Sequence, residues 1–301
     1  MPLLKTEAEK LSQNDVVSGI IEEIITVNEV FGLLPFVQVN GKAYVYKREN
    51  ALPSVSYLDP NDVVTEDAGT FTEIVTKLRI LAGDVDVDKF LANTMSDTED
   101  QLATQIGLKA KALGRAFQLS MVEGNNTTNA KEFDGLKALV TVPQTMSTSA
   151  NGGALTLGIL DQLVDQVPNR PDFLMMRSGT RRAYTALLRA SGGNSGAMIQ
   201  HKNFDVPVLA HNGVPILVND YLPGNETKGT LAAAACSVYA VRANELDGIH
   251  GLYGGANAGI NVEDIGTVQN KDATRTRLKW YVGMALKSTK SVARLEGISN
   301  I

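Results

Sequence analysis

The chain has 301 residues, of which 44% are hydrophobic and 20% charged, and its formal net charge at pH 7 is -5. This balance is ordinary for a folded globular protein, so disordered and fibrous classes are excluded. The single cysteine, Cys236, excludes a disulfide framework and a zinc site built from several cysteines, and it suits a reducing compartment.

Charge is distributed unevenly along the chain. Residues 1–100 carry 8 Lys and Arg against 18 Asp and Glu, a net of -10, whereas residues 101–301 carry 20 against 15, a net of +5. Two interpretations stay open: scattered solvated charge, or head-to-tail assembly in which the acidic part of one subunit meets the basic body of the next. No basic segment followed by an apolar core opens the chain, and glutamates interrupt residues 19–36, so neither a secretion signal nor a membrane span is expected.

A helix and a long hairpin are the first elements predicted. Apolar residues at helical spacing over residues 13–31 indicate an amphipathic helix. Alternating apolar and polar side chains then predict two strands, over residues 37–48 and 70–82, each about 40 Å long at roughly 3.3 Å per residue. Since an isolated two-stranded ribbon is marginal in water, we expect a second copy of the chain to cover it.

We call residues 37–83 the arm and residues 50–69 the arm tip. The arm tip holds two prolines and several acids and is expected to be exposed. A change of phase predicts a bend near Gly83, and residues 84–88, Asp-Val-Asp-Val-Asp, then form an exposed acidic edge. They are not a calcium loop, because the glycine and glutamate that such a loop requires are missing.

The best-marked helix is predicted over residues 97–123 and opens with a capping box, Ser-Asp-Thr-Glu, at residues 96–99. Its apolar stripe consists of Leu102, Ile106, Ala110, Leu113, Phe117 and Met121. At 1.5 Å per residue it spans roughly 40 Å, which is long enough to be the spine of a lobe.

From residue 155 the pattern becomes α/β. It predicts helices over 157–166 and 180–190, strands around 173–176, 206–209, 216–218 and 231–241, and a Gly-rich loop over 247–259. Residues 274–298 read as two strands of one sheet whose first partner lies far upstream, so the chain is expected to return to its first lobe.

Residues that could carry chemistry are few. His201, His211 and His250 lie in predicted loops or at strand edges and are expected to be surface or turn histidines. The chain has no nucleophile elbow and no phosphate-binding loop, and Cys236 lies in a predicted buried strand. No catalytic, cofactor-binding or metal-binding residue is therefore predicted. An α/β enzyme stays open as an alternative that requires titratable groups to converge around His201 and His211.

A basic cluster lies on the predicted helix near the middle of the chain, at Arg177, Arg181, Arg182 and Arg189. It is either a solvated helix face or a surface that meets acids of a neighbouring subunit. Because no aromatic residues are interleaved and the protein is acidic overall, any contact with nucleic acid should be weak and non-specific.

The order of helix, long arm, spine helix, α/β lobe and return resembles the major capsid protein of tailed bacteriophages, which has the Hong Kong 97 type fold. The segments that carry the resemblance are Val85-Asp86-Val87-Asp88-Lys89-Phe90-Leu91-Ala92-Asn93, Phe133-Asp134-Gly135-Leu136, Gly213-Val214-Pro215-Ile216, Asp220-Tyr221-Leu222-Pro223, Ser237-Val238-Tyr239-Ala240-Val241 and Thr276-Arg277-Leu278-Lys279-Trp280-Tyr281-Val282-Gly283-Met284-Ala285. They span nearly the whole chain, and their order and spacing give them weight.

The resemblance implies an α+β Hong Kong 97 type capsid fold. Its parts would be an N-terminal arm and helix (1–36), the extended β-hairpin arm or E-loop (37–83), a peripheral domain (84–140 and 259–301) with the spine helix 97–123, and an α/β axial domain (141–258). It also implies a structural, non-enzymatic protein that assembles in the host cytoplasm into hexamers and pentamers of an icosahedral virion shell around double-stranded DNA. An encapsulin-type compartment shares the fold and stays open as an alternative.

Further partners follow from the same resemblance. The first helix begins too early to leave room for a built-in scaffolding domain, so the resemblance implies either a separate scaffolding protein or assembly without one. It also implies portal and decoration proteins and no membrane partner. The candidates for contact between subunits are Lys42, Tyr44, Tyr46, Lys47, Glu66, Asp67, Arg177, Arg181 and Arg182. Some family members join an arm lysine to an asparagine of a neighbour. Lys42 or Lys47 could be such a donor, but neither the partner asparagine nor the activating acid aligns in this sequence, so this chemistry is not carried over.

Overall fold

The computed structural model describes residues 29–41, 43–90, 101–192, 197–199, 207–255 and 259–299. The helices are α2 (Glu29–Leu33), α4 (Gln101–Glu123), α5 (Leu136–Leu139), α6 (Leu157–Asp165) and α7 (Ser178–Ala190), with 3-10 turns η1 (Val142–Gln144) and η2 (Thr289–Ser291). The strands are β1 (Phe36–Gln38), β2 (Tyr44–Ala51), β3 (Thr70–Thr76), β4 (Arg79–Asp88), β5 (Thr145–Ser147), β6 (Phe173–Met176), β7 (Ala197–Ile199), β8 (Val208–His211), β9 (Val214–Val218), β10 (Glu226–Lys228), β11 (Leu231–Val241), β12 (Ile249–Gly254), β13 (Asn261–Thr267), β14 (Ala273–Leu286) and β15 (Val292–Ile298).

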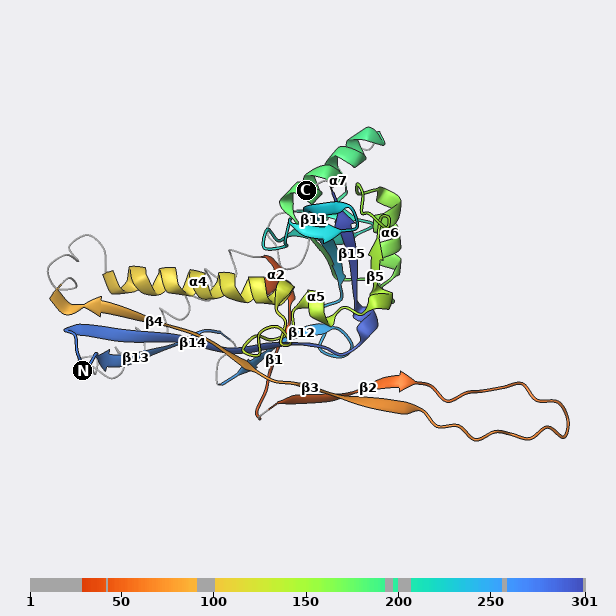
Figure 1. Cartoon of the computed structure of the whole chain (residues 1–301), viewed down its shortest axis with the longest axis horizontal. Helices are drawn as coiled ribbons and strands as arrows, with labels where there is room; N and C mark the ends of the chain where they lie inside the picture. Colours follow the sequence, from red (N-terminus) through yellow and green to blue (C-terminus); the bar gives the residue numbers. More distant parts are fainter. Residues whose placement is uncertain are drawn as a thin grey trace, which may run out of the picture.

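Two sheets and one separate hairpin organise the described residues (Figure 1). The five-stranded sheet has the order β1-β12-β14-β13, and β4 pairs with β14 along its other edge. The eight-stranded sheet has the order β5-β15-β11-β6-β9-β8-β7, and β10 pairs with the end of β11. The hairpin consists of β2 and β3.

Helix α4 lies along one face of the five-stranded sheet, as Figure 1 shows. Its predicted stripe is confirmed: Ile106, Ala110, Leu113, Phe117 and Met121 are buried, and Leu102 packs partly against them. The Phe117 ring lies 4.7 Å from that of Trp280 on β14 and 5.6 Å from that of Phe133. The helix and the sheet therefore share one aromatic core, which stiffens a long and otherwise thin lobe.

Helices α6 and α7 cover one face of the eight-stranded sheet. On β6, Leu174 and Met176 point to the core under these helices, while Phe173 and Met175 join the core that contains α4. Both faces of β6 are thus covered, which explains why its four residues are all apolar and all buried. One continuous apolar core connects the two lobes.

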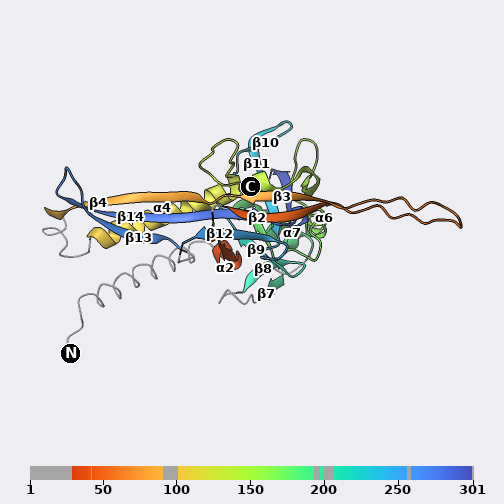
Figure 2. The same cartoon turned by 90° about the horizontal axis from the view of Figure 1, so that it is seen from below.

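The hairpin β2–β3 lies on the face of the five-stranded sheet opposite α4, and the arm tip extends well beyond the body (Figures 1 and 2). A small apolar cluster joins them: Val39, Leu252 and Ala285 are buried, with Tyr44 and Tyr46 packed against them. The arm as a hairpin with an exposed tip agrees with the sequence pattern, because every residue of the tip is exposed.

The strand limits expected in the arm are wrong in two places. The first strand is divided into β1, which pairs in parallel with β12, and β2, which pairs with β3. The second is divided at Lys77 and Leu78, where the chain passes from the hairpin into the five-stranded sheet. No bend occurs at Gly83, which lies inside β4 opposite Leu278. The alternation of side chains along these strands was predicted correctly, but periodicity does not reveal which partner a strand has.

Two expectations for the C-terminal third are also wrong. Residues 249–254 of the expected Gly-rich loop form β12, an inner strand, in which Gly251 lets the Phe36 ring approach the backbone. Strands β14 and β15 belong to different sheets. Sheet membership therefore differs from the expected domain limits, because β12 joins the five-stranded sheet and β15 joins the eight-stranded one.

The expectation that His211 and His250 are surface or turn histidines is wrong. His211 ends β8 and is buried, and His250 lies in β12 and is fully buried. Both lie on a sheet face that another element covers: the arm hairpin lies over His250, and Asp161 of α6 and Tyr184 of α7 contact His211. His201, Lys42, the first part of the N-terminal helix and the capping box at 96–99 lie outside the described residues.

Candidate assembly surfaces

The arm base, which we define as β2 and β3, is fixed to its own body by hydrogen bonds at the end of β14. The Tyr46 hydroxyl donates to the Leu286 carbonyl oxygen at 2.7 Å. The Arg48 guanidinium donates to the same oxygen at 2.6 Å and to the Lys287 carbonyl oxygen at 2.8 Å. Leu286 is the last residue of β14 and Lys287 follows it, so these bonds tie the hairpin to the main chain at the end of this strand.

Tyr44 and Tyr46, two of the predicted contact residues, are half-buried against their own chain. The Tyr44 ring meets His250 edge-on at 5.5 Å and lies 5.7 Å from the Tyr46 ring. Burial raises the pKa of Tyr46 above its usual value, although Arg48 acts against this. Alternation along β2 places Tyr44, Tyr46 and Arg48 on this inner face. Arg48 was missed in the sequence, although the same alternation would have revealed it.

Lys47 lies on the opposite, outer face of the arm base, beside partly exposed apolar residues. Val45 is 51% exposed and is paired with Val75, which is 52% exposed, and Phe71 is 70% exposed. Lys47 itself is opposite Glu73. This outer face mixes apolar and charged side chains, a composition typical of protein interfaces rather than of free surface.

The arm tip is both apolar and acidic. Val55 is 94% exposed and Tyr57 is fully exposed, and neither has apolar cover from its own chain. Residues 50–69 contain four acids and neither Lys nor Arg. Of the predicted contacts here, Glu66 is exposed, whereas Asp67 accepts hydrogen bonds from the Ser54 and Ala68 amides. These bonds lower the pKa of Asp67 and hold the two sides of the loop together.

The arginine cluster divides into one structural and three exposed residues. Arg177 precedes α7 and is half-buried, with its guanidinium lying over Gly224. Asp220 accepts a hydrogen bond from the Ser178 amide at 3.0 Å, so a carboxylate already occupies the N-terminus of α7. Hydrogen bonding to Ser178 lowers the pKa of Asp220. Arg181, Arg182 and Arg189 are exposed.

The acidic edge at residues 84–88 is paired within the subunit. Asp84 and Asp86 accept bidentate hydrogen bonds from Arg277 and Arg275 of β14, at 2.6–2.8 Å. These bonds lower the pKa of both carboxyl groups. Part of the charge difference between the two halves of the sequence is therefore neutralised inside one chain. The acids of the arm tip have no such cationic partner among the described residues.

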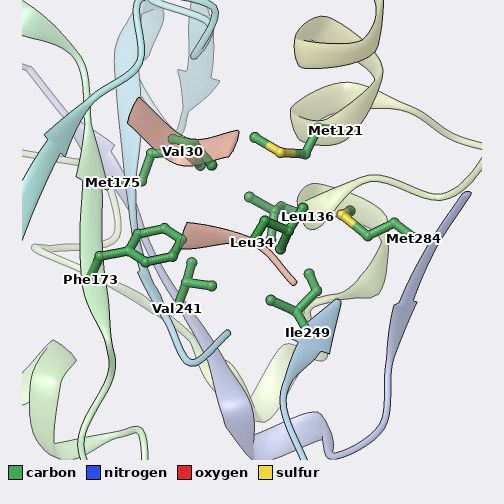
Figure 3. A pocket seen from close by; sticks show the side chains of 9 residues that line it. All are labelled: Val30, Leu34, Met121, Leu136, Phe173, Met175, Val241, Ile249 and Met284. Atoms are coloured by element: carbon green, nitrogen blue, oxygen red, sulfur yellow. The ribbon is translucent and has the colours of Figure 1, made fainter. Parts of the chain in front are cut away.

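A cavity where the two lobes meet offers no reactive groups. Its volume is about 10 Å³, at the lower limit of the roughly 10–15 Å³ that one water needs. Figure 3 shows its apolar lining, contributed by Val30, Leu34, Met121, Leu136, Phe173, Met175, Val241, Ile249 and Met284. The cavity is a packing defect of the shared core.

One titratable cluster surrounds His211; the enzyme alternative required such groups to converge around both His201 and His211, and His201 lies outside the described residues. The His211 Nε2 lies 2.9 Å from Asp161 of α6, and its Nδ1 lies 3.2 Å from the Tyr184 hydroxyl of α7. His211 thus binds both other groups and joins the two helices to β8. Neither the cavity at the lobe junction nor the surface pocket beside β4 includes them. Within the described residues, no group of three His, Cys, Asp or Glu could hold a metal ion.

The described helices include none that is long and apolar enough to cross a membrane.

The fold itself is that of viral and compartment shells. The encapsulin SrpI of Synechococcus elongatus PCC 7942 superimposes with a TM-score of 0.68 at 19% identity, covering 90% of this chain and 87% of that one. The capsid of an empty GTA particle superimposes with a TM-score of 0.68 at 14% sequence identity, and the structure from Mycobacterium phage Adephagia with a TM-score of 0.61 at 15% identity. Each match covers 89% of both chains. The chain therefore has the Hong Kong 97 type fold that these proteins share.

The family model of the SU10 major capsid protein matches residues 65–299. The chain belongs to this family, and its role is that of a structural capsid protein that associates with copies of itself in a virion. No curated protein is matched by the sequence.

Proposed function

We propose that this chain forms the icosahedral head of a tailed bacteriophage around double-stranded DNA, by way of pentamers and hexamers. The observation that carries the proposal is the arm. A tip with 94% exposure at Val55 and full exposure at Tyr57 gains little within its own subunit, but it gains apolar burial when a neighbour covers it.

The remaining contacts follow the same logic. The outer face with Lys47, the acidic residue Glu66 and the exposed pair Arg181 and Arg182 are proposed to meet neighbouring subunits. Asp67, Tyr44, Tyr46 and Arg177 are proposed to contribute mainly by shaping these surfaces, since their side chains contact their own chain. Lys42 stays a candidate from sequence. The lobe with the eight-stranded sheet would face the ring axes, and the lobe with α4 would form the wall.

Partners beyond the chain itself are proposed from the resemblance alone. Separate scaffolding, portal and decoration proteins would complete a head assembled in the host cytoplasm, with non-specific contact to packaged DNA. We propose no catalytic role, because the family to which the chain belongs is one of structural capsid proteins. Head assembly would depend on salt, since the acidic tip would steer toward basic surfaces.

The test is to replace the tip, residues 52–68, with a short Gly-containing turn. The body should keep its far-UV spectrum and melting temperature, while negative-stain microscopy and sedimentation should show loss of closed shells. A matched control keeps the full length and replaces only two uncharged polar tip residues, Ser56 and Thr65, by alanine; it should form normal shells. Normal shells from the shortened chain would refute the proposed role of the arm.

An encapsulin-type compartment is the second candidate, favoured by the match to SrpI encapsulin. The two functions differ in what the shell contains. Purified particles that carry nuclease-protected double-stranded DNA would support the phage head, whereas particles that carry a single co-purifying protein cargo and no DNA would support the compartment.

A further inference from the structure

His250 lies beneath the arm base with no hydrogen bond to hold it. It is fully buried, and neither Nδ1 nor Nε2 has a partner among the described residues. It belongs to β12, opposite Ala285 of β14, on the face of the sheet that the hairpin covers. Burial of an imidazole favours its neutral form, because it removes the hydration that a positive charge needs.

The cover over His250 is the arm itself. The Tyr44 ring meets it edge-on at 5.5 Å, and the Lys287 Nζ lies 5.9 Å from the centre of the same Tyr44 ring. When the arm base lifts, Tyr44 and Tyr46 leave with it, and His250 becomes accessible to water. Protonation of His250 and docking of the arm base are therefore coupled events.

The environment of His250 disfavours a positive charge on its imidazole. The titratable and charged groups on the elements packed around it are Tyr44, Tyr46 and Arg48 of β2, Lys287 after β14, and Glu245 and Asp247 before β12. Burial is the main cause that lowers the pKa of His250, and Lys287 adds to it. The nearby backbone of Asn244 and Gly248 and the exposed Glu245 act in the opposite direction but are outweighed. Asp247 is engaged with Arg242 at 3.2 Å.

We propose that His250 makes the arm base a pH-sensitive latch, closed at neutral pH and released when acid protonates the imidazole. The sign follows from the linkage. The docked arm holds His250 neutral, whereas in the lifted arm the imidazole titrates near its usual pKa of about 6.5. Docking is thus fully stable above that pH and weakens below it, by up to about tenfold per pH unit, until the docked form itself takes the proton.

This latch belongs to a single chain and does not depend on the proposed phage function. A released base would let the arm change its angle relative to the body without breaking either large sheet, because β2 and β3 pair with each other and form a separate hairpin. The consequence is a subunit whose longest connector is rigid at one pH and mobile at another.

The experiment compares amide hydrogen exchange of the full-length unassembled chain between pH 7.5 and 5.0, corrected for intrinsic exchange rates. In the wild type, protection of β2 and β3 should fall by up to about tenfold per pH unit below about 6.5, while β11 and β15 stay protected. His250→Phe, which keeps a ring against Tyr44, should abolish this pH dependence. His211→Gln, a buried histidine far from the arm, is the control and should retain it.

Two further measurements keep the test decisive if His250→Phe folds poorly. The His250 resonance in a ¹³C-histidine spectrum of the wild type should stay neutral below pH 6.5 for as long as the arm base is protected. Lys287→Met should reduce the total pH effect, because it removes a like charge from the docked state only. Unchanged protection of the arm base down to pH 5.0, or an equal loss in His250→Phe, would overturn the latch.

Discussion

Arg48→Met should loosen the arm base without unfolding the body. The substitution removes two hydrogen bonds from a charged donor, to the Leu286 oxygen at 2.6 Å and the Lys287 oxygen at 2.8 Å. Bonds of this kind contribute roughly 1.5–3 kcal/mol each. The Leu286 oxygen keeps its bond from Tyr46, and the guanidinium is only half-buried, so we take about 2 kcal/mol for the pair.

A change of about 2 kcal/mol corresponds to roughly a 30-fold rise in local opening, since about 1.4 kcal/mol is tenfold. Hydrogen exchange of β2 and β3 amides at neutral pH measures this opening directly. Lys47→Met is the matched control, because Lys47 lies on the same strand and faces away from the body. Its exchange should change by less than about threefold, which is about 0.6 kcal/mol.

The reasoning fails if Arg48→Met exchanges within about twofold of the wild type, or if Lys47→Met loosens the strand as much. In the first case the arm base would be held by the cluster around Val39 and Leu252 alone. In the second case the hairpin itself, rather than its attachment, would limit exchange. Arg48→Lys should fall between the wild type and Arg48→Met, because an ammonium cannot reach both carbonyls with the same planar geometry.

Two further predictions concern the core that carries the arm. Phe117→Ala should lower the free energy of unfolding by about 3–5 kcal/mol, because it deletes a fully buried ring that contacts Phe133 and Trp280. Denaturant unfolding measures this change, and a loss below about 1 kcal/mol would contradict the packing. Gly135→Ala should lower the free energy of unfolding by about 1–3 kcal/mol in the same assay. The new Cβ would lie 2.5 Å from the Ser120 carbonyl oxygen and 2.8 Å from the Gly124 nitrogen. An unchanged stability would mean that this turn can shift.

The sequence predicted local structure well wherever the pattern was long and regular. The apolar stripe of α4 and the four apolar residues of β6 identify their elements because burial on one face or on both leaves a distinct periodicity. It predicted less about contacts. Tyr44 and Tyr46 appeared to be surface residues of a ribbon, yet they face the outer side of the five-stranded sheet, which is formed by strands about 200 residues further along the chain.

What the sequence by itself determined is a protein with a spine helix, an α/β lobe and a hairpin that cannot bury itself, because composition and period decide how much apolar surface each segment carries. Only the tertiary structure decided that β14 and β15 separate into two sheets, that the acids of β4 are neutralised by Arg275 and Arg277, and that the arm base closes over His250. These are pairings between distant segments. Periodicity fixes which face of a strand is apolar, but it does not specify which distant segment comes to lie against that face.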